Sequence, residues 1–225
     1  MKLYRFRAIS PIENILDIVV NKRLHGAPYE KLNDPLEGVF LSVFQYHPVM
    51  SNLGLSGSGI GSIKSPPIIS QATVTDLPFV NECRVCSLSA TMADIRLWSH
   101  YAGGHTGVAI ELDLDAVDDL HEVEYRDSLA EFTPSLLGGP TSKDVLRLKT
   151  KHWEYEREFR LLTKQEFYPI PGRITAIYLG LRTSDLMAGV ILRSVADSIP
   201  VYKTGVNLNS LEIEQSGPLN RGVET

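Results

Sequence analysis

Short stretches of the chain alternate apolar and polar residues, the pattern that half-buried β-strands produce. The stretch from Leu3 to Ile9 changes character at nearly every position and is predicted to be the first strand. Other stretches place apolar residues three or four positions apart, which favours amphipathic helices. We therefore expect strands at 3–9, 80–90, 107–113, 122–125, 159–162 and 174–179, helices at 14–21, 91–100 and 142–153, and a helical turn with an edge strand within 191–201.

The order of these elements indicates one domain of the α+β class. Strands outnumber helices and do not alternate strictly with them, so a mixed, mostly antiparallel sheet with a few flanking helices is expected. This domain is predicted to span residues 1–210. A Gly- and Ser-rich insert at about 51–67 is predicted to be a flexible loop, and the polar tail at 211–225 is predicted to fray.

Composition narrows the classes of function. The 225 residues are 43% hydrophobic and 22% charged, which is ordinary for a globular protein. The net charge of −5 argues against broad electrostatic capture of duplex nucleic acid, although a local basic patch is compatible with it. Apolar runs are shorter than the ~20 residues that a membrane-spanning helix needs, and the first residues lack the apolar block of a signal peptide. A cytoplasmic protein with no membrane partner is expected.

The two cysteines, Cys83 and Cys86, form a C-x-x-C pair. A zinc site requires a second pair or two histidines at metal-binding spacing, and the five-residue interval from His100 to His105 places these side chains on different faces of a helix. The cysteines also lie in a predicted strand and not at the start of a helix, where redox motifs occur. We therefore expect reduced, metal-free thiols.

Three polar motifs interrupt the apolar pattern. The first combines Arg5 and Arg7 on the first predicted strand with N-D-P-L-E at 33–37. The second is W-S-H-Y-A-G-G-H-T-G at 98–107, and the third is W-E-Y-E-R-E-F-R-L at 153–161. The second is the hardest to assign to a core, because four such neighbouring side chains cannot all be buried without several hydrogen-bond partners.

Together the motifs resemble those of a bacterial domain family of unknown function. Its members show L-Y-K-Y-R, F-N-D-P-F-E, C-F-S, W-S-H-Y-A-x-x-H-x-G and W-x-Y-E-x-E-W-R in this order. Here the pattern reads L-Y-R-F-R at 3–7, L-N-D-P-L-E at 32–37, C-S-L-S at 86–89 and the two motifs at 98–107 and 153–161, so the resemblance covers roughly residues 3–181. Leu36 replaces an aromatic residue, and the insert at 51–67 is specific to this chain. The family name implies no activity.

The chemistry of the third motif comes from its glutamates. Glu156 and Glu158 are two positions apart, so on an extended segment both carboxylates face the same way, and Glu154 extends the row. Such a row repels itself unless donors lie opposite. Arg7, Arg160, His100 and Tyr101 are the candidate donors.

The order of the motifs also resembles ADP-ribosyltransferases, including the small toxins of that superfamily. An arginine lies on the first strand, an aromatic and hydroxyl cluster in mid-chain, and E-x-E near the last core strands. The resemblance implies an ADP-ribosyltransferase-like fold, NAD as the substrate and no metal. It implies that Glu158 is the catalytic carboxylate, that Glu156 orients the acceptor, that Tyr101 and His100 frame the nicotinamide, and that the dinucleotide is bound by Arg7, Arg5, Trp98, Ser99, Asn33 and Asp34.

Each motif also has a purely structural interpretation. Glu156 and Arg160 have the i, i+4 spacing of a surface ion pair on a helix. Arg5 and Arg7 have the spacing of the solvated face of an edge strand. Trp98 and Tyr101 have the i, i+3 spacing typical of core packing.

Three hypotheses about function follow. The leading one is an NAD-consuming transferase, a toxin or defence effector that modifies nucleic acid or protein and that an antitoxin or other partner protein restrains. The second is a metal-independent hydrolase such as a nuclease, using His100, His105 and the carboxylates. The third is a non-catalytic module that binds a nucleotide or a partner. The first requires Arg7, His100, Tyr101 and Glu158 to meet around one cleft.

Overall fold

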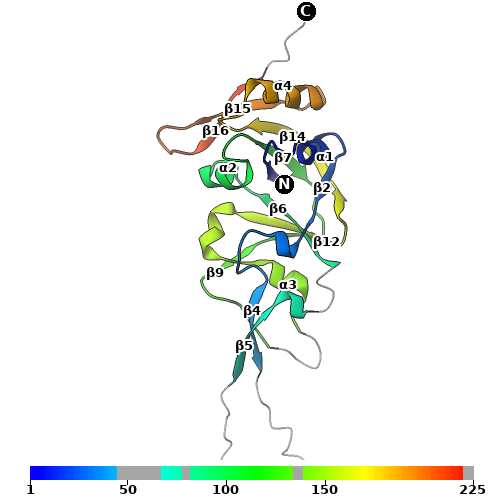
Figure 1. Ribbon diagram of the computed structural model, residues 1–225, viewed down its shortest axis with the longest axis vertical. Coiled ribbons are helices and arrows are strands. Elements are labelled where there is room, and N and C mark those ends of the chain that lie inside the picture. Colours follow the sequence, from blue (N-terminus) through cyan, green and yellow to red (C-terminus); the bar gives the residue numbers. More distant parts are fainter. Residues whose placement is uncertain (45–66, 78–81, 134–138, 220–225) are drawn as a thin grey trace, which may run out of the picture.

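A nine-stranded sheet forms the body of the computed structural model, which describes residues 1–44, 67–77, 82–133 and 139–219. Only the β14–β15 pair in this sheet is parallel, and the other pairs are antiparallel. The strand order is β16 (Ile213–Pro218), β15 (Val201–Val206), β14 (Gly172–Leu179), β7 (Val108–Leu114), β1 (Lys2–Arg7), β6 (Arg84–Ser89), β12 (Glu158–Thr163) and β8 (Leu120–Glu122), with β3 (Ala27–Pro28) also paired to β6 (Figure 1).

Helices cover both faces of the sheet. Successive strand residues point to opposite faces, so Leu3 and Phe6 belong to different layers. Leu3 packs in one apolar cluster with buried residues of α1 (Glu13–Val19) and α4 (Asp185–Ser194). Phe6 packs in a second cluster with Trp98 of α2 (Ile95–Tyr101). The central strands β7 and β12 are therefore buried on both sides, whereas the edge strand β16 is largely exposed.

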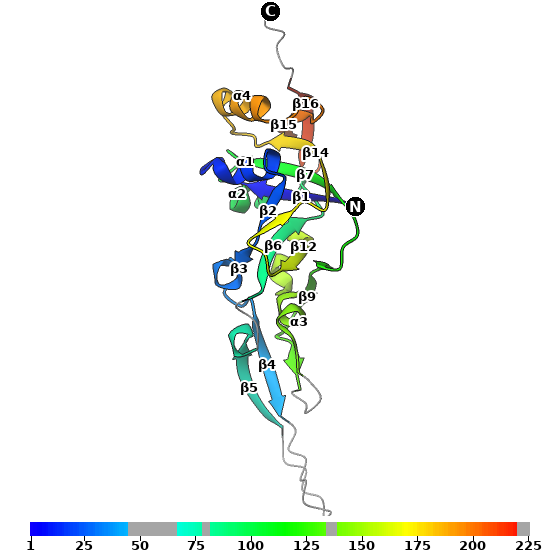
Figure 2. The ribbon, with the colours of Figure 1, turned by 90° about the vertical axis from the view of Figure 1, so that its right-hand side faces the viewer.

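Smaller sheets extend this body. β10 (Glu131–Phe132), β4 (Val39–Phe44) and β5 (Ile68–Thr73) form a three-stranded sheet at the opposite end of the elongated molecule from α4 (Figure 2). β2 (Arg23–His25) pairs with β13 (Phe167–Pro169), and β9 (Glu124–Arg126) pairs in parallel with β11 (Leu148–Thr150). α3 (Ser142–Leu146) precedes β11, and short 3-10 helices occupy Tyr29–Lys31 (η1), Val74–Asp76 (η2) and Lys151–Glu156 (η4).

The main sheet opens between β1 and β6. β1 is in register with β7 from Lys2 to Arg7, but its register with β6 is confined to Tyr4 opposite Ser89. The strands diverge from this point, and β3 pairs with β6 where β1 has moved away, with Ala27 opposite Val85. A gap in the sheet thus lies next to Arg5 and Arg7.

The expected α+β class and mostly antiparallel pairing are confirmed, but the helix predicted at 142–153 is wrong. α3 ends at Leu146, and the next residues form β11 and then η4. Thr141 and Asp144 form a capping box that starts α3. The helix stops because the backbone of 148–150 pairs with β9, which tertiary structure favours over local periodicity.

The prediction that the chain frays after Leu211 is also wrong. Ile213–Pro218 forms β16, which pairs with β15 as the edge of the main sheet. Ile213 is buried in the cluster that contains Trp98, and this single apolar anchor outweighs the polar character of its neighbours. The strand predicted within 191–201 instead follows at β15, after α4.

Three further expectations concern the insert, membrane spans and the cysteines. The Gly- and Ser-rich insert at 51–67 lies outside the described residues apart from its last position. Across the part of the chain that the structure describes, no helix has the length and apolar character needed to span a bilayer. Cys83 is half-buried and Cys86 is buried, and neither is in a disulfide.

Gly107 packs closely against the end of β1, the strand that carries Arg5 and Arg7. A Cβ at this position would lie 2.0 Å from the Arg7 carbonyl oxygen and 2.9 Å from the Ala8 Cα. We expect Gly107→Ala to lower the free energy of unfolding by about 1–3 kcal/mol, because the end of β1 must move. Chemical denaturation measures this, with Gly217→Ala as a control whose Cβ would meet no heavy atom within 4 Å. Equal stability of the two variants would contradict the packing described.

Candidate functional site

A cavity of about 220 Å³ lies at the gap between β1 and β6. Side chains from distant parts of the sequence line it, including β1, the segment after η1, β6, the end of α2, β11 and the start of β12. The charged and hydroxyl-bearing lining residues are Tyr4, Arg5, Arg7, Lys31, Glu37, Ser87, Ser89, Tyr101, Lys149, Glu156, Glu158 and Arg160. So many ionisable groups around a gap in a sheet make it the candidate site.

Two arginines form one wall. Arg5 and Arg7 are two positions apart on β1, so their side chains project to the same side. Arg5 donates to the Ser87 carbonyl oxygen across the gap. The Nε atoms of both arginines are buried and have no hydrogen-bond partner among the residues that the structure describes.

Arg7 lacks a counter-ion. The described residues place no carboxylate within ion-pair distance of its guanidinium. Burial, followed by repulsion from Arg5, lowers the pKa of Arg7 to about 9, so the group is still cationic at neutral pH. A buried cation without an anion is unfavourable unless a ligand supplies the charge.

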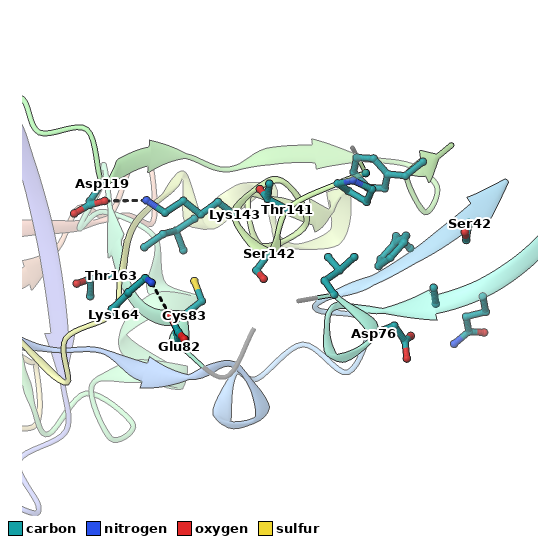
Figure 3. A pocket seen from close by; sticks show the side chains of 18 of the residues that line it. Ser42, Asp76, Glu82, Cys83, Asp119, Thr141, Ser142, Lys143, Thr163 and Lys164 are labelled. Atoms are coloured by element: carbon teal, nitrogen blue, oxygen red, sulfur yellow. Dashed lines mark hydrogen bonds and ion pairs between the residues drawn. The ribbon is translucent and has the colours of Figure 1, made fainter. Parts of the chain in front are cut away.

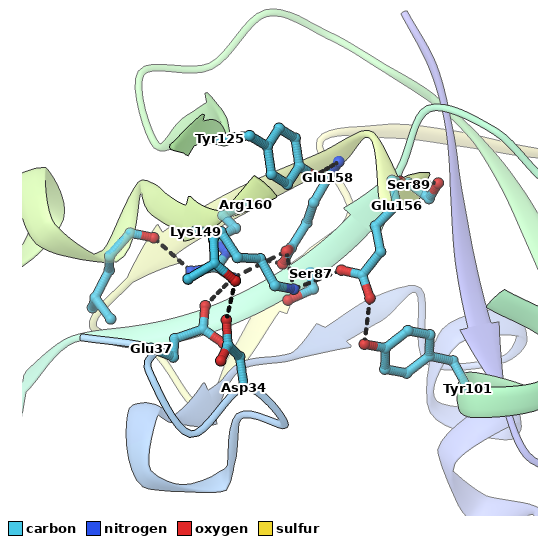
Figure 4. Close-up of polar contacts among 12 residues, drawn as sticks. Asp34, Glu37, Ser87, Ser89, Tyr101, Tyr125, Lys149, Glu156, Glu158 and Arg160 are labelled. Carbon is cyan, nitrogen blue, oxygen red and sulfur yellow. Dashed lines mark hydrogen bonds and ion pairs between the residues drawn. The ribbon is translucent and has the colours of Figure 1, made fainter. Parts of the chain in front are cut away.

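A carboxylate and ammonium cluster forms the opposite wall (Figure 4). The Nζ of Lys149 lies 2.6 Å from Glu156 Oε2 and 2.8 Å from Glu158 Oε2. All three side chains are at least 95% buried. Removing one partner of an ion pair this dry leaves an uncompensated buried charge, which costs far more stability than breaking a surface pair.

Arg160 is the second cation of the cluster. Its Nε lies 2.8 Å from Glu158 Oε1, one amino group lies 3.0 Å from Glu158 Oε2, and another donates to the Leu146 carbonyl oxygen. The guanidinium also pairs with Glu37. Burial raises the pKa of Glu158, but Arg160 and Lys149 outweigh it and lower the pKa to about 2. Burial dominates at Glu37 and raises the pKa of that carboxyl.

The backbone between the two glutamates turns both of them toward Lys149. Glu156 ends η4, Arg157 has a left-handed φ of 43°, and Glu158 begins β12. Ser89 donates to the Glu156 carbonyl oxygen at 2.6 Å, and the Glu158 amide donates to the Tyr125 hydroxyl at 2.8 Å. The carboxylates meet because of this turn and not because of the extended segment that the sequence predicted.

The cluster carries a negative excess. Glu37, Glu156 and Glu158 are three carboxylates, and Lys149 and Arg160 are two cations, so one negative charge remains when all are ionised. Tyr101 donates its hydroxyl to Glu156 Oε1 at 2.6 Å. The cavity therefore has a cationic wall on β1 and an anionic wall opposite.

Most of the predicted site residues meet here. Tyr101 and Asn33 line the cavity with both arginines and both glutamates. Asp34 lies beside the cluster, buried, and its carboxylate accepts from the Leu36 amide at 2.9 Å and from the Thr150 hydroxyl at 3.4 Å.

Three predicted residues lie elsewhere. Trp98 is fully buried, with its ring 5.2 Å from that of Phe6, so it packs the core and presents no face to a ligand. Ser99 is exposed and lies 3.1 Å from a ring nitrogen of His105. His100 is exposed, and its ring is 6.4 Å from that of Trp153. The reason is helical geometry: Leu97 and Tyr101, four positions apart, share the face of α2 that reaches the cavity.

Lys149 is the residue that the sequence analysis missed. It lies in a stretch predicted to be helical, where a lysine is ordinarily solvated. Glu37 belonged to a recognised motif but had no assigned role. Both residues could be sought from the requirement that buried charges have partners of opposite sign, since a buried pair of carboxylates requires cations close by.

A second cavity, of about 1330 Å³, lies between the β4–β5 sheet and α3 (Figure 3). Its described walls include Phe40, Phe132 and Leu162. Two lysines at its edge pair with carboxylates, Lys143 with Asp119 at 2.9 Å and Lys164 with Glu82 at 2.5 Å. This cavity is larger, but both of its described lysines have a carboxylate partner, whereas Arg7 in the smaller one has none among the described residues.

Comparison with known proteins adds no assignment. The chain matches no family model, no curated protein and no solved structure. Both resemblances in motif order therefore stay predictions, and the assignment of a function depends on the chemistry of the cavity.

Proposed function

We propose that the cavity between β1 and β6 binds NAD and that the protein transfers its ADP-ribosyl group to a macromolecular acceptor. The observation that carries the proposal is Arg7, a half-buried arginine with no counter-ion among the described residues, which faces the carboxylates of Glu156 and Glu158 across one cavity. A phosphate at Arg7 would satisfy the cation. An ADP-ribosyltransferase-like fold, and a role as a toxin or defence effector, belong to the same proposal.

The size of the cavity limits what it encloses. Typical small-molecule sites are roughly 300–1,000 Å³. A cavity of about 220 Å³ encloses only part of a dinucleotide. Placing the diphosphate at Arg5 and Arg7 and the nicotinamide ribose beside Glu156 and Glu158 uses both walls, with the adenosine end outside.

The reaction uses the separation of charge between these walls. The bond between the ribose anomeric carbon and nicotinamide breaks, and its electron pair leaves with the nicotinamide nitrogen, which becomes neutral. The positive charge that develops on the ribose is stabilised by the carboxylates opposite. The acceptor's nucleophilic atom then bonds to the anomeric carbon, and its proton passes to Glu156.

A non-catalytic nucleotide-binding module is the second candidate, because it would use the same arginines and would leave the carboxylates as a structural cluster. The hydrolase is supported least. It relied on His100 and His105, and neither histidine lines the cavity.

Arg7→Met tests the proposal. We expect NAD to bind about 10- to 100-fold more weakly, because a charge-assisted bond to phosphate is lost. The melting temperature should stay the same or rise, because the variant removes a partly desolvated cation that has no ion pair among the described residues. Calorimetric titration with NAD and thermal unfolding provide the two measurements.

Arg173→Met is the matched control. Arg173 is exposed on β14 and pairs with Asp113, so its loss should leave NAD binding unchanged. Release of nicotinamide by the wild type separates the transferase from the module. Binding without release favours the module, and absence of NAD binding by the wild type contradicts both.

A further inference from the structure

Lys149 occupies an unusual position for a lysine. It is the middle residue of β11, which pairs in parallel with β9, and it is 8% exposed. Its neighbours in the strand, Leu148 and Thr150, are both more exposed. Lysines are almost never buried to this extent unless they are paired.

The ammonium group has a complete set of partners. Two carboxylates lie at 2.6 and 2.8 Å from its nitrogen, on Glu156 and Glu158 respectively. The ring of Trp153 lies beside it, with its centroid at 4.9 Å from the nitrogen. An ammonium has three hydrogens to donate, and two carboxylates and one aromatic ring surround it here.

We propose that Lys149 is the positioning residue of this site, which binds the two carboxylates as one unit and keeps both ionised. Arg160 binds Glu158, and Tyr101 binds Glu156. Among the described side chains, Lys149 is the one that contacts both carboxylates. The identity of the ligand rests on the proposed function, but the role of Lys149 is testable without turnover.

The surrounding charges make the role of Lys149 specific. Without its ammonium, two buried carboxylates would face each other, and like charges that share a site raise the pKa of one of them. Arg160 would still neutralise Glu158, whereas Glu156 would keep the Tyr101 hydroxyl but no cation of this cluster. The groups that face the ammonium come from five segments: Glu37 before β4, Tyr101 on α2, Tyr125 on β9, Glu156 on η4, and Glu158 and Arg160 on β12.

The experiment compares Lys149→Met with Lys149→Arg. Glutamate carboxyl groups labelled with ¹³C are titrated by NMR in the whole protein. In Lys149→Met, one carboxyl of the pair should titrate about one to three pH units higher than in the wild type. Lys149→Arg retains the charge and should restore most of the difference. Lys143→Met, which removes an exposed lysine paired with Asp119, should leave both carboxyls unchanged.

Unchanged titration of both glutamates in folded Lys149→Met would overturn the proposal. If Lys149→Met does not fold, Lys149→Met with Glu156→Gln removes the carboxylate left without a cation, and this double variant should recover stability. Failure of the double variant to recover any stability would also overturn it.

Nicotinamide release is measured on the same samples. If the wild type is active, Lys149→Met should lower kcat while KM for NAD changes by less than about threefold, because Arg5 and Arg7 are intact. The acid limb of the pH profile should move to higher pH. If the wild type releases no nicotinamide, the transferase proposal fails, and the NMR titration still decides the role of Lys149.

Discussion

Glu158→Gln should reduce NAD cleavage by about 10²–10³-fold, the loss typical of removing one preorganised electrostatic group at a reacting centre. The substitution preserves the size of the side chain and one acceptor oxygen but removes its charge. The anionic wall then becomes neutral, because two carboxylates face the two cations Lys149 and Arg160. Nicotinamide release at saturating NAD measures the effect.

Glu37→Gln is the control that distinguishes a catalytic role of Glu158 from a structural one. Glu37 pairs with the same Arg160 guanidinium and is equally buried. In the proposed mechanism, however, Glu158 and not Glu37 lies beside the reacting ribose. We expect Glu37→Gln to lower stability less than Glu158→Gln, because burial already raises the pKa of Glu37, and to retain most NAD cleavage. Equal losses of activity would assign Glu158 a structural role. Glu156→Gln should reduce transfer to the acceptor more than it reduces cleavage.

Arg160→Met should lower the free energy of unfolding by roughly 3–5 kcal/mol, the loss expected when one partner of a buried ion pair is removed. Arg160 is fully buried and binds Glu158, Glu37 and the Leu146 carbonyl oxygen. Its removal leaves the three carboxylates of Glu37, Glu156 and Glu158 with Lys149 as the only cation of the cluster described above. Denaturant unfolding at neutral pH measures the change.

The pH dependence of stability provides a second measurement on the same variant. The pKa of Glu158 is lowered from its usual 4.5 to about 2 in the folded protein. Its contribution to stability is therefore complete above pH 4.5 and is lost as pH falls toward 2. Arg160→Met should flatten this acid dependence. A variant as stable as the wild type at neutral pH, with the same acid dependence, would contradict the assignment of Arg160 as the main partner of Glu158.

The sequence predicted the body of the fold because periodicity reports burial. β1, β7 and β14 were recognised from their apolar pattern, and their neighbours in the sheet satisfy it. It failed at 142–153, where the apolar spacing is helical but pairing with β9 decides the backbone. It failed again at Ile213, because a single buried residue produces no periodicity. Local pattern cannot reveal a partner strand that lies far away in the sequence.

The candidate site was predicted in part for similar reasons. Arginine and glutamate motifs are informative because their charges require partners, and Arg7, Tyr101 and Glu158 do line one cavity. Trp98, Ser99 and His100 were included because they neighbour Tyr101 in sequence, yet a helix turns adjacent residues in different directions. Lys149 was missed because a lone lysine has no signature until the carboxylates around it are placed.

The narrow junction between β1 and β6 has a mechanical consequence. The arginines belong to the half of the sheet that contains β1, and Glu158 and Arg160 belong to the half that contains β6 and β12. In the sheet these halves meet only at Tyr4 opposite Ser89. The width of the gap therefore depends on the angle between these two halves. A small rotation about the Tyr4–Ser89 pair changes the separation of the opposite charges several residues away. A molecule that binds to both walls would hold together two halves of the sheet that share one backbone pairing.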